Sequence, residues 1–289
     1  AAPVPTCVAS APRVPTVAAV PAAPMWTLDR IRDVAEGAYR RYHRREYLHP
    51  DPLEVVHEYR RPEDREVVAL TASALALGQV ESILKACRQV LSAFPRPYEE
   101  LLRLDRREIA DRLDGFVYRF FRTSHMSDFL FGVGEMLRRY GSLEAGFLAG
   151  YSEDHETVMP GLTDFVARLS TYAGGDHGIL LSFPAKGSAS KRLHLFLRWM
   201  VRRDALDLGD WTRVDPAKLL VPVDTHMLRI SRYLGISSRK SADRAASEEI
   251  TAFFRGIEPA DPAKYDFALT RAGIHPELSQ QDLAAVLEV

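Results

Sequence analysis

Apolar residues along most of this chain recur with the spacing of α-helices. From Leu28 to Tyr42 apolar side chains return every three or four positions, with arginines between them, as on one face of a helix. The stretch "RPEDREVVALTASALALG" is apolar on nearly every side from Val67 to Leu77, which is typical of a helix buried all round. The following "VESILKACRQVLSAF" resumes the helical spacing and ends at Pro95.

Shorter helical segments follow, and alternating strand-like stretches are scarce. The spacing predicts further helices over residues 98–113, 115–122, 126–140, 142–149, 160–172, 188–203, 225–234, 242–255 and 261–272. A chain in which nearly every apolar stretch has the helical period buries helices against helices. The pattern therefore predicts an all-α protein.

The first residues follow a different pattern. Residues 1–24, "AAPVPTCVASAPRVPTVAAVPAAP", contain proline too often for a helix or a central strand. They also lack the basic start and proline-free apolar core of a secretory signal. We expect a disordered N-terminal tail over 1–24 and a single helical domain over 25–289.

Composition narrows the choice of partners only slightly. A chain of 289 residues can bury a large core, and its net charge of −1 indicates no partner by overall charge. Cys7 and Cys87 are too few for a disulfide framework or a four-thiolate metal site. No apolar run approaches the roughly 18 residues that span a membrane. We expect a cytoplasmic protein with no membrane partner, metal or cofactor.

One aspartate stands out in "LLVPVDTHMLRISRYLG", which runs from Leu219 to Gly235. Asp224 lies between an apolar run and the helical spacing of 225–234, at the position of a helix N-cap. A carboxylate there accepts hydrogen bonds from the first free backbone N–H groups. Asp224 is therefore either a cap alone or a cap that also has a chemical function.

Basic residues cluster on both sides of this aspartate. Six lie between Lys186 and Arg203 and four between Thr225 and Lys240, with no acidic residue in the second stretch and none before Arg203 in the first. The helical period puts Lys191, His194, Arg198 and Arg202 on one polar face of the helix over 188–203. These faces are either simply solvated or form a local positive surface suited to a polyanion such as DNA.

Several motifs resemble one superfamily. "VPVDTHMLRISRYLG" resembles the catalytic stretch of the helix-hairpin-helix DNA glycosylases, the endonuclease III superfamily. "VVALTASALALGQVESILKACRQVL" resembles the superfamily's earlier helix, which ends in a glutamine that approaches DNA, here Gln79. "GSASKRLHLFLRWMVR" and "KYDFALTRAGI" resemble an uncharacterised prokaryotic family of this superfamily, over nearly all of Tyr47 to Ile274.

The resemblance implies a two-lobed, helix-hairpin-helix glycosylase-like fold and a role for each motif. Asp224 would stabilise the positive charge that develops on the sugar as an N-glycosidic bond breaks. Lys191 would be either the amine nucleophile that forms a Schiff base or a phosphate contact. Gln79 would either fill the gap left by an extruded base or cap its helix.

The resemblance also implies contacts with DNA. The expected contact residues are Gln79, Gly187, Ser188, Ser190, Arg192, Arg198, His226 and Arg229. The stretch "FPAKGSASKRL", residues 183–193, matches the position of the superfamily's hairpin between two helices but departs from its pattern at Ala185, and the cysteine-rich iron–sulfur segment is absent. The separation of 33 positions from Lys191 to Asp224 resembles that in the archaeal 8-oxoguanine DNA glycosylases.

The implied function is base excision repair. A monomer, associated with the nucleoid, would remove an oxidised, 8-oxoguanine-like base from double-stranded DNA, with AP lyase activity if Lys191 is the nucleophile. Two alternatives stay open: a non-catalytic protein that binds DNA structures and retains the fold, and a helical scaffold for an acidic protein. Trp199 and Trp211 either stack on an extruded base or pack in the core.

Overall fold

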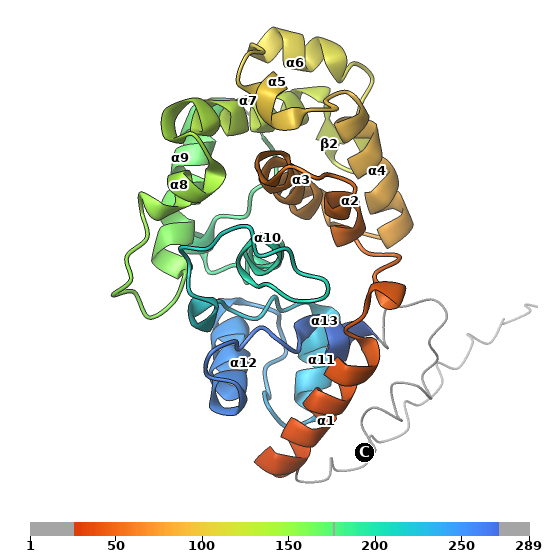
Figure 1. Cartoon of the computed structure of the whole chain (residues 1–289), viewed down its shortest axis with the longest axis vertical. Helices are drawn as coiled ribbons and strands as arrows, with labels where there is room; N and C mark the ends of the chain where they lie inside the picture. Colours follow the sequence, from red (N-terminus) through yellow and green to blue (C-terminus); the bar gives the residue numbers. More distant parts are fainter. Residues whose placement is uncertain (1–25, 176, 272–289) are drawn as a thin grey trace, which may run out of the picture.

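The computed structural model describes residues 26–175 and 177–271, and the expected tail over 1–24 lies outside them. The described part is built from α-helices, short 3-10 helices and one small β-hairpin (Figure 1). The helices are α1 (Leu28–Tyr42), α2 (Leu53–His57), α3 (Pro62–Leu75), α4 (Val80–Ser92), α5 (Pro97–Leu101), α6 (Arg106–Arg112), α7 (Thr123–Tyr140), α8 (Leu143–Leu148), α9 (Met159–Ala173), α10 (Lys191–Val201), α11 (Thr225–Tyr233), α12 (Arg244–Ile257) and α13 (Asp266–Arg271). The 3-10 helices are η1 (Arg45–Tyr47), η2 (Pro184–Lys186) and η3 (Pro216–Lys218).

These elements confirm the all-α class, with local corrections. The expected helix over 115–122 is instead the hairpin of β1 (Val117–Tyr118) and β2 (Phe121–Arg122). Burial alternates along β1, and aromatic and β-branched residues favour such a half-buried strand. The expected helix over 98–113 divides into α5 and α6 because Asp105 caps α6 from within it.

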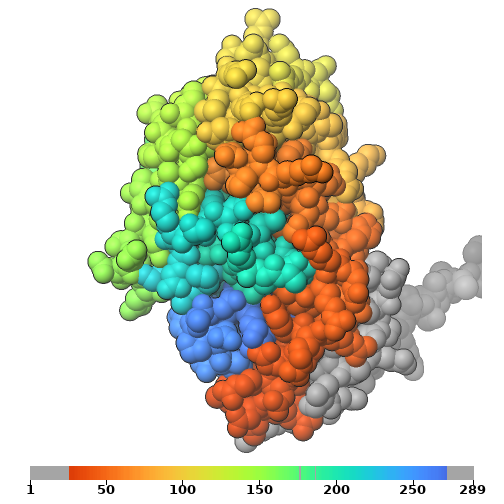
Figure 2. All heavy atoms as spheres, in the orientation of Figure 1, coloured from red at the N-terminus to blue at the C-terminus, as the bar shows by residue number. Residues whose placement is uncertain are grey.

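Buried apolar residues form two clusters. The larger cluster contains the cores of α2 to α10, and the smaller one contains α1 together with α11, α12 and part of α13, whose Phe267 belongs to the larger cluster. Figure 1 shows the two groups in the upper and lower halves of the view, with α10 between them. In Figure 2 the teal segment likewise lies between the orange and yellow part above and the blue and red part below. The first and the last described helices thus share one core.

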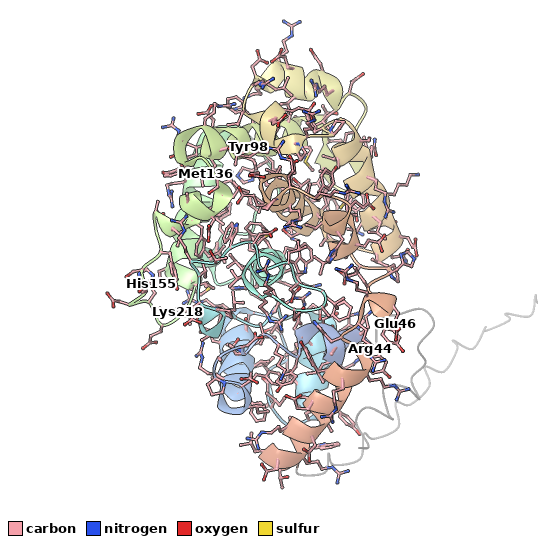
Figure 3. The ribbon with its side chains drawn as sticks, viewed as in Figure 1. Arg44, Glu46, Tyr98, Met136, His155 and Lys218 are labelled. Carbon is pink, nitrogen blue, oxygen red and sulfur yellow. The ribbon has the colours of Figure 1, made fainter. Side chains whose placement is uncertain are left out.

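Helix α3 passes through the larger cluster, as its composition predicts. Every residue from Glu66 to Leu75 is buried. Between α10 and α11 the chain passes through η3, where the backbone N–H of Val158 donates to the carbonyl of Lys218 at 3.0 Å. Lys218 and His155 accordingly lie near each other in Figure 3. Among the described residues no helix has both the length and the apolar character needed to cross a bilayer.

Candidate active site at the starts of two helices

Asp224 caps α11, as its position in the sequence predicts. Its Oδ1 atom accepts hydrogen bonds from the backbone N–H groups of His226 at 2.9 Å and Met227 at 2.8 Å. Its backbone is extended, which is the usual conformation of an N-cap residue. The cap therefore fixes one carboxylate oxygen and leaves the other, Oδ2, to contact groups outside the helix.

Lys191 contacts this second oxygen. Its Nζ atom lies 3.0 Å from Asp224 Oδ2, although the two residues are 33 positions apart in sequence. Lys191 is the first residue of α10, so the N-terminal ends of α10 and α11 meet at this ion pair. The side chains of Lys191 and Asp224 are 35% and 18% exposed, so the amine and the carboxylate are both accessible to a ligand.

The surroundings of Asp224 favour its charged form. Burial by itself raises the pKa of the carboxyl group, but the charge of Lys191 and the N–H of Met227 outweigh it. The net result is a pKa below the ordinary value of an aspartate. Asp224 is therefore a fixed negative charge at neutral pH, and it is a weak proton acceptor.

The ion pair lies on the wall of a cavity of about 760 Å³. The cavity is bordered by the segment 50–52, the turn between α3 and α4, the starts of α10 and α11, and α13. It thus touches elements of both apolar clusters. Of the site residues expected from sequence, the structure brings together Gln79, Ser188, Ser190, Lys191, Arg192, Asp224 and His226 around it.

Gln79 is exposed on the rim of this cavity. It occupies the N-cap position of α4, but its side chain makes no capping hydrogen bond. The preceding Gly78 has a φ of +118°, a conformation that residues with a Cβ rarely adopt. The turn therefore presents the Gln79 amide outward instead of using it to end or begin a helix.

The turn before α10 is held in an unusual conformation. Ser190 has a φ of +45°, in the left-handed region where a residue with a Cβ is strained. The Ser190 N–H donates to Ser188 Oγ at 3.1 Å, and the Arg244 N–H donates to the carbonyl of Gly187 at 3.2 Å. The first turn of the expected helix over 188–203 is consequently not helical, and α10 begins at Lys191.

Two of the residues expected to contact DNA bind other groups of the protein instead. Arg198 is 2% exposed and forms ion pairs with Asp207 and Asp266, so the expectation that it reaches DNA is wrong. His194 and Arg202 are also buried, so the part of this polar face that follows Lys191 is internal rather than solvated. Arg192 lines the cavity, but its guanidinium donates to the backbone carbonyls of Ala74 and Ile179.

The remaining expected contacts lie near the cavity without lining it. Arg229 is exposed on α11, and Gly187 is exposed in the turn before α10. Trp211 packs in the larger cluster, where its Nε1 donates to Glu66 Oε2 at 3.1 Å. Trp199 is also fully buried but lies next to the cavity.

Sequence reasoning missed two carboxylates of the cavity. Asp51 and Asp266 both line it, one before α2 and the other at the start of α13. The pKa of Asp266 is raised to about 6, because burial and the charge of Asp224 together outweigh the opposite effect of Arg198. In the sequence Asp266 resembles an ordinary acidic residue of a first helical turn. Only the proximity of Asp266 to Asp224 in space distinguishes it from such ordinary acidic residues.

The arrangement provides a fixed carboxylate, a primary amine and a hydrogen-bonding amide around one cavity. This set can bind a charged or polar ligand, stabilise a developing positive charge and supply a nucleophile. Within the part of the chain that the structure describes, no three histidine, cysteine or acidic residues are close enough together to hold a metal ion.

Comparison with known proteins gives one match. The model of a protein family described as a protein of unknown function (DUF2400) matches residues 51–275. These residues include the turn of Gln79, the Lys191–Asp224 pair and both additional carboxylates. No curated protein and no solved structure matches the chain significantly.

Proposed function

The chain belongs to the DUF2400 family, and we propose that it is a DNA glycosylase that removes a damaged base from duplex DNA. The observation that carries the proposal is the 3.0 Å contact between Lys191 Nζ and Asp224 Oδ2 in a cavity that Gln79 also borders. A cavity of about 760 Å³ has the size of a site for a small molecule such as an extruded nucleobase.

The fold of the superfamily belongs to the same proposal. Two apolar clusters with the cavity between elements of both support a two-lobed arrangement in which DNA lies across the starts of α10 and α11. The start of α10 has no side-chain cap, and uncapped N–H groups at a helix start favour phosphate oxygens. The enzyme would act as a monomer in the cytoplasm, near the nucleoid, because all of the groups that the proposed reaction needs come from one chain.

In the proposed reaction Asp224 stabilises the positive charge on the sugar as the glycosidic bond lengthens. If the enzyme is also an AP lyase, the deprotonated Lys191 amine forms a bond to C1′ and the base leaves with a proton. Opening of the sugar ring then gives a Schiff base, and strand cleavage follows. Lys191 acts in this step as the free amine, and the proton that its nitrogen loses on bonding to C1′ is the one that the departing base takes.

The experiment is excision from a panel of duplexes, each with one oxidised, deaminated or alkylated base, with sodium borohydride trapping in parallel. We expect release of an oxidised purine such as 8-oxoguanine. Lys191→Gln should abolish trapping and keep most of the affinity for DNA, whereas Lys240→Gln, at an exposed lysine outside the cavity, should preserve both. Equal trapping of Lys191→Gln and wild type would make Lys191 a phosphate contact.

One observation favours a second function. Both oxygens of Asp224 have structural partners, the cap of α11 and Lys191, so the ion pair could exist only to join two helices. The protein would then bind DNA structures without cutting them. Tight binding together with no released base across the whole panel would support this alternative.

A further inference from the structure

The β-hairpin carries two of the few large apolar side chains that the described part exposes. Val117 is 58% exposed and Phe120 is 64% exposed. Phe120 and Arg119 form the two-residue turn between β1 and β2, and the Arg119 guanidinium lies 5.6 Å from the Phe120 ring centroid. An aromatic ring displayed at the tip of a turn contributes nothing to the core and is available to a partner.

The hairpin is fixed to the turn that carries Gln79. The hydroxyl of the buried Tyr118 donates to the carbonyl of Leu77 at 2.7 Å. The Arg119 side chain packs on Gly78 so closely that a Cβ there would lie 2.7 Å from Arg119 Nη1. The hairpin tip and Gln79 therefore keep a constant spatial relation to each other.

A groove of about 540 Å³ runs between this hairpin and α4. Among the described residues that line it, the charged ones are Lys85 and Arg119, and none is a carboxylate. Neither cation forms an ion pair with any residue of the described ranges. The other polar residues of the groove are Gln79, Ser82 and Gln89, which can donate hydrogen bonds to phosphate or base oxygens.

We propose that this groove binds an unpaired stretch of a nucleic acid strand, with phosphates at Lys85 and Arg119 and a base stacked on Phe120. A basic groove beside an exposed aromatic ring is the combination that proteins use for single strands, since stacking holds any base and cations hold the backbone. An acidic protein would satisfy the cations but would leave the role of the ring unexplained.

The position of Gln79 connects this groove with the catalytic cavity. Gln79 borders both, so a strand in the groove continues directly to the rim of the Lys191–Asp224 cavity. This continuity rests on the proposed function, and it implies that the enzyme prefers a target base beside unpaired nucleotides. The binding itself requires no excision and can be measured separately.

The test compares the affinity of the full chain for three fluorescent probes without lesions: a paired duplex, the same duplex with a short bubble, and a short oligothymidylate. We expect tighter binding of the bubble and of the oligothymidylate than of the paired duplex. Phe120→Ala should weaken binding to these two probes about tenfold and change duplex affinity far less. Lys85→Gln should reduce the slope of log affinity against log salt by about 0.7 for the single strand.

Leu28→Ala and Arg103→Gln are matched controls, because they alter an exposed apolar side chain and an exposed cation that line neither cavity. They should leave all affinities unchanged. Unchanged bubble and oligothymidylate binding by Phe120→Ala would overturn the groove proposal, even if the wild type excises bases. Loss of bubble and oligothymidylate binding by Phe120→Ala would support the groove proposal, even if the wild type releases no base from the lesion panel. Failure of this proposal and failure of the glycosylase proposal are thus separate results.

Discussion

Each oxygen of the Asp224 carboxylate has its own partners, and this division defines the chemistry of the residue. Oδ1 holds the start of α11 through two N–H groups, and Oδ2 holds Lys191. The cap contacts need only an oxygen acceptor, which an asparagine also provides. The contact with Lys191 and the proposed stabilisation of a cationic sugar need the charge. The two roles can therefore be separated by one substitution.

We expect Asp224→Asn to lower the free energy of unfolding by about 1 kcal/mol or less and to slow base excision by about 100-fold or more. Duplex affinity should persist or increase, because a negative charge is lost. Melting temperature, duplex affinity and excision rate can be measured on the same preparation.

Asp243→Asn is the matched control for this variant. Asp243 caps α12 through the N–H of Ala246 at 2.9 Å and does not line the cavity. The Asp243→Asn variant should lose about as much stability as Asp224→Asn and should retain the full rate of base excision. Normal excision by folded Asp224→Asn protein would reduce Asp224 to a cap.

At the scale of an element, α10 has a polar face that points inward. His194 lies on this face, 2% exposed, and its Nδ1 has no hydrogen-bond partner among the described residues. Burial, together with the nearby charge of Arg244, lowers the pKa of His194 to about 4. The imidazole is therefore neutral in the folded protein at pH 7.

This burial predicts a pH dependence of stability. Because the folded-state pKa is below the unfolded value of 6.5, the contribution of His194 is complete above pH 6.5 and is lost as the pH falls towards 4. The stability of the wild type relative to His194→Gln should fall by about 3 kcal/mol over this window. Urea unfolding of both proteins at each pH measures the difference, in which other titrating groups cancel. A constant difference would mean that the imidazole is protonated without cost.

At the scale of the whole molecule, buried ion pairs connect the two apolar clusters. Arg202, which follows α10, pairs with Asp204 at 2.8 Å, with Asp261 at 2.8 Å and with Asp207. Asp204 in turn contacts His43 at the end of α1, with 2.9 Å between His43 Nε2 and Asp204 Oδ1. The connection after α10 is thus tied to α1 and to the segment before α13.

We expect Arg202→Met to lower the free energy of unfolding by about 3–5 kcal/mol, since it leaves buried carboxylates without their cation. Arg203→Met changes the adjacent, exposed arginine and should cost less than about 0.5 kcal/mol. Chemical denaturation of the two variants against wild type provides the comparison. Equal stability of the two variants would mean that the carboxylates lose their charge or gain water without cost.

The sequence alone determined what depends on neighbours along the chain. The all-α class, the burial of α3, and Asp224 as the cap of α11 all follow from helical period and cap chemistry, which act over a few residues. The 115–122 segment was predicted wrongly because short apolar stretches do not distinguish a helix from a hairpin.

Only the tertiary structure decided which polar groups meet. The basic residues between 188 and 203 have the same spacing whether they face water or protein, yet Arg198 and Arg202 are buried with aspartates from distant segments. The same holds for Asp51 and Asp266, which border the cavity of Asp224 although no local pattern distinguishes them. Charge and spacing specify a side chain's chemistry, whereas its burial and partners depend on contacts between residues far apart in sequence.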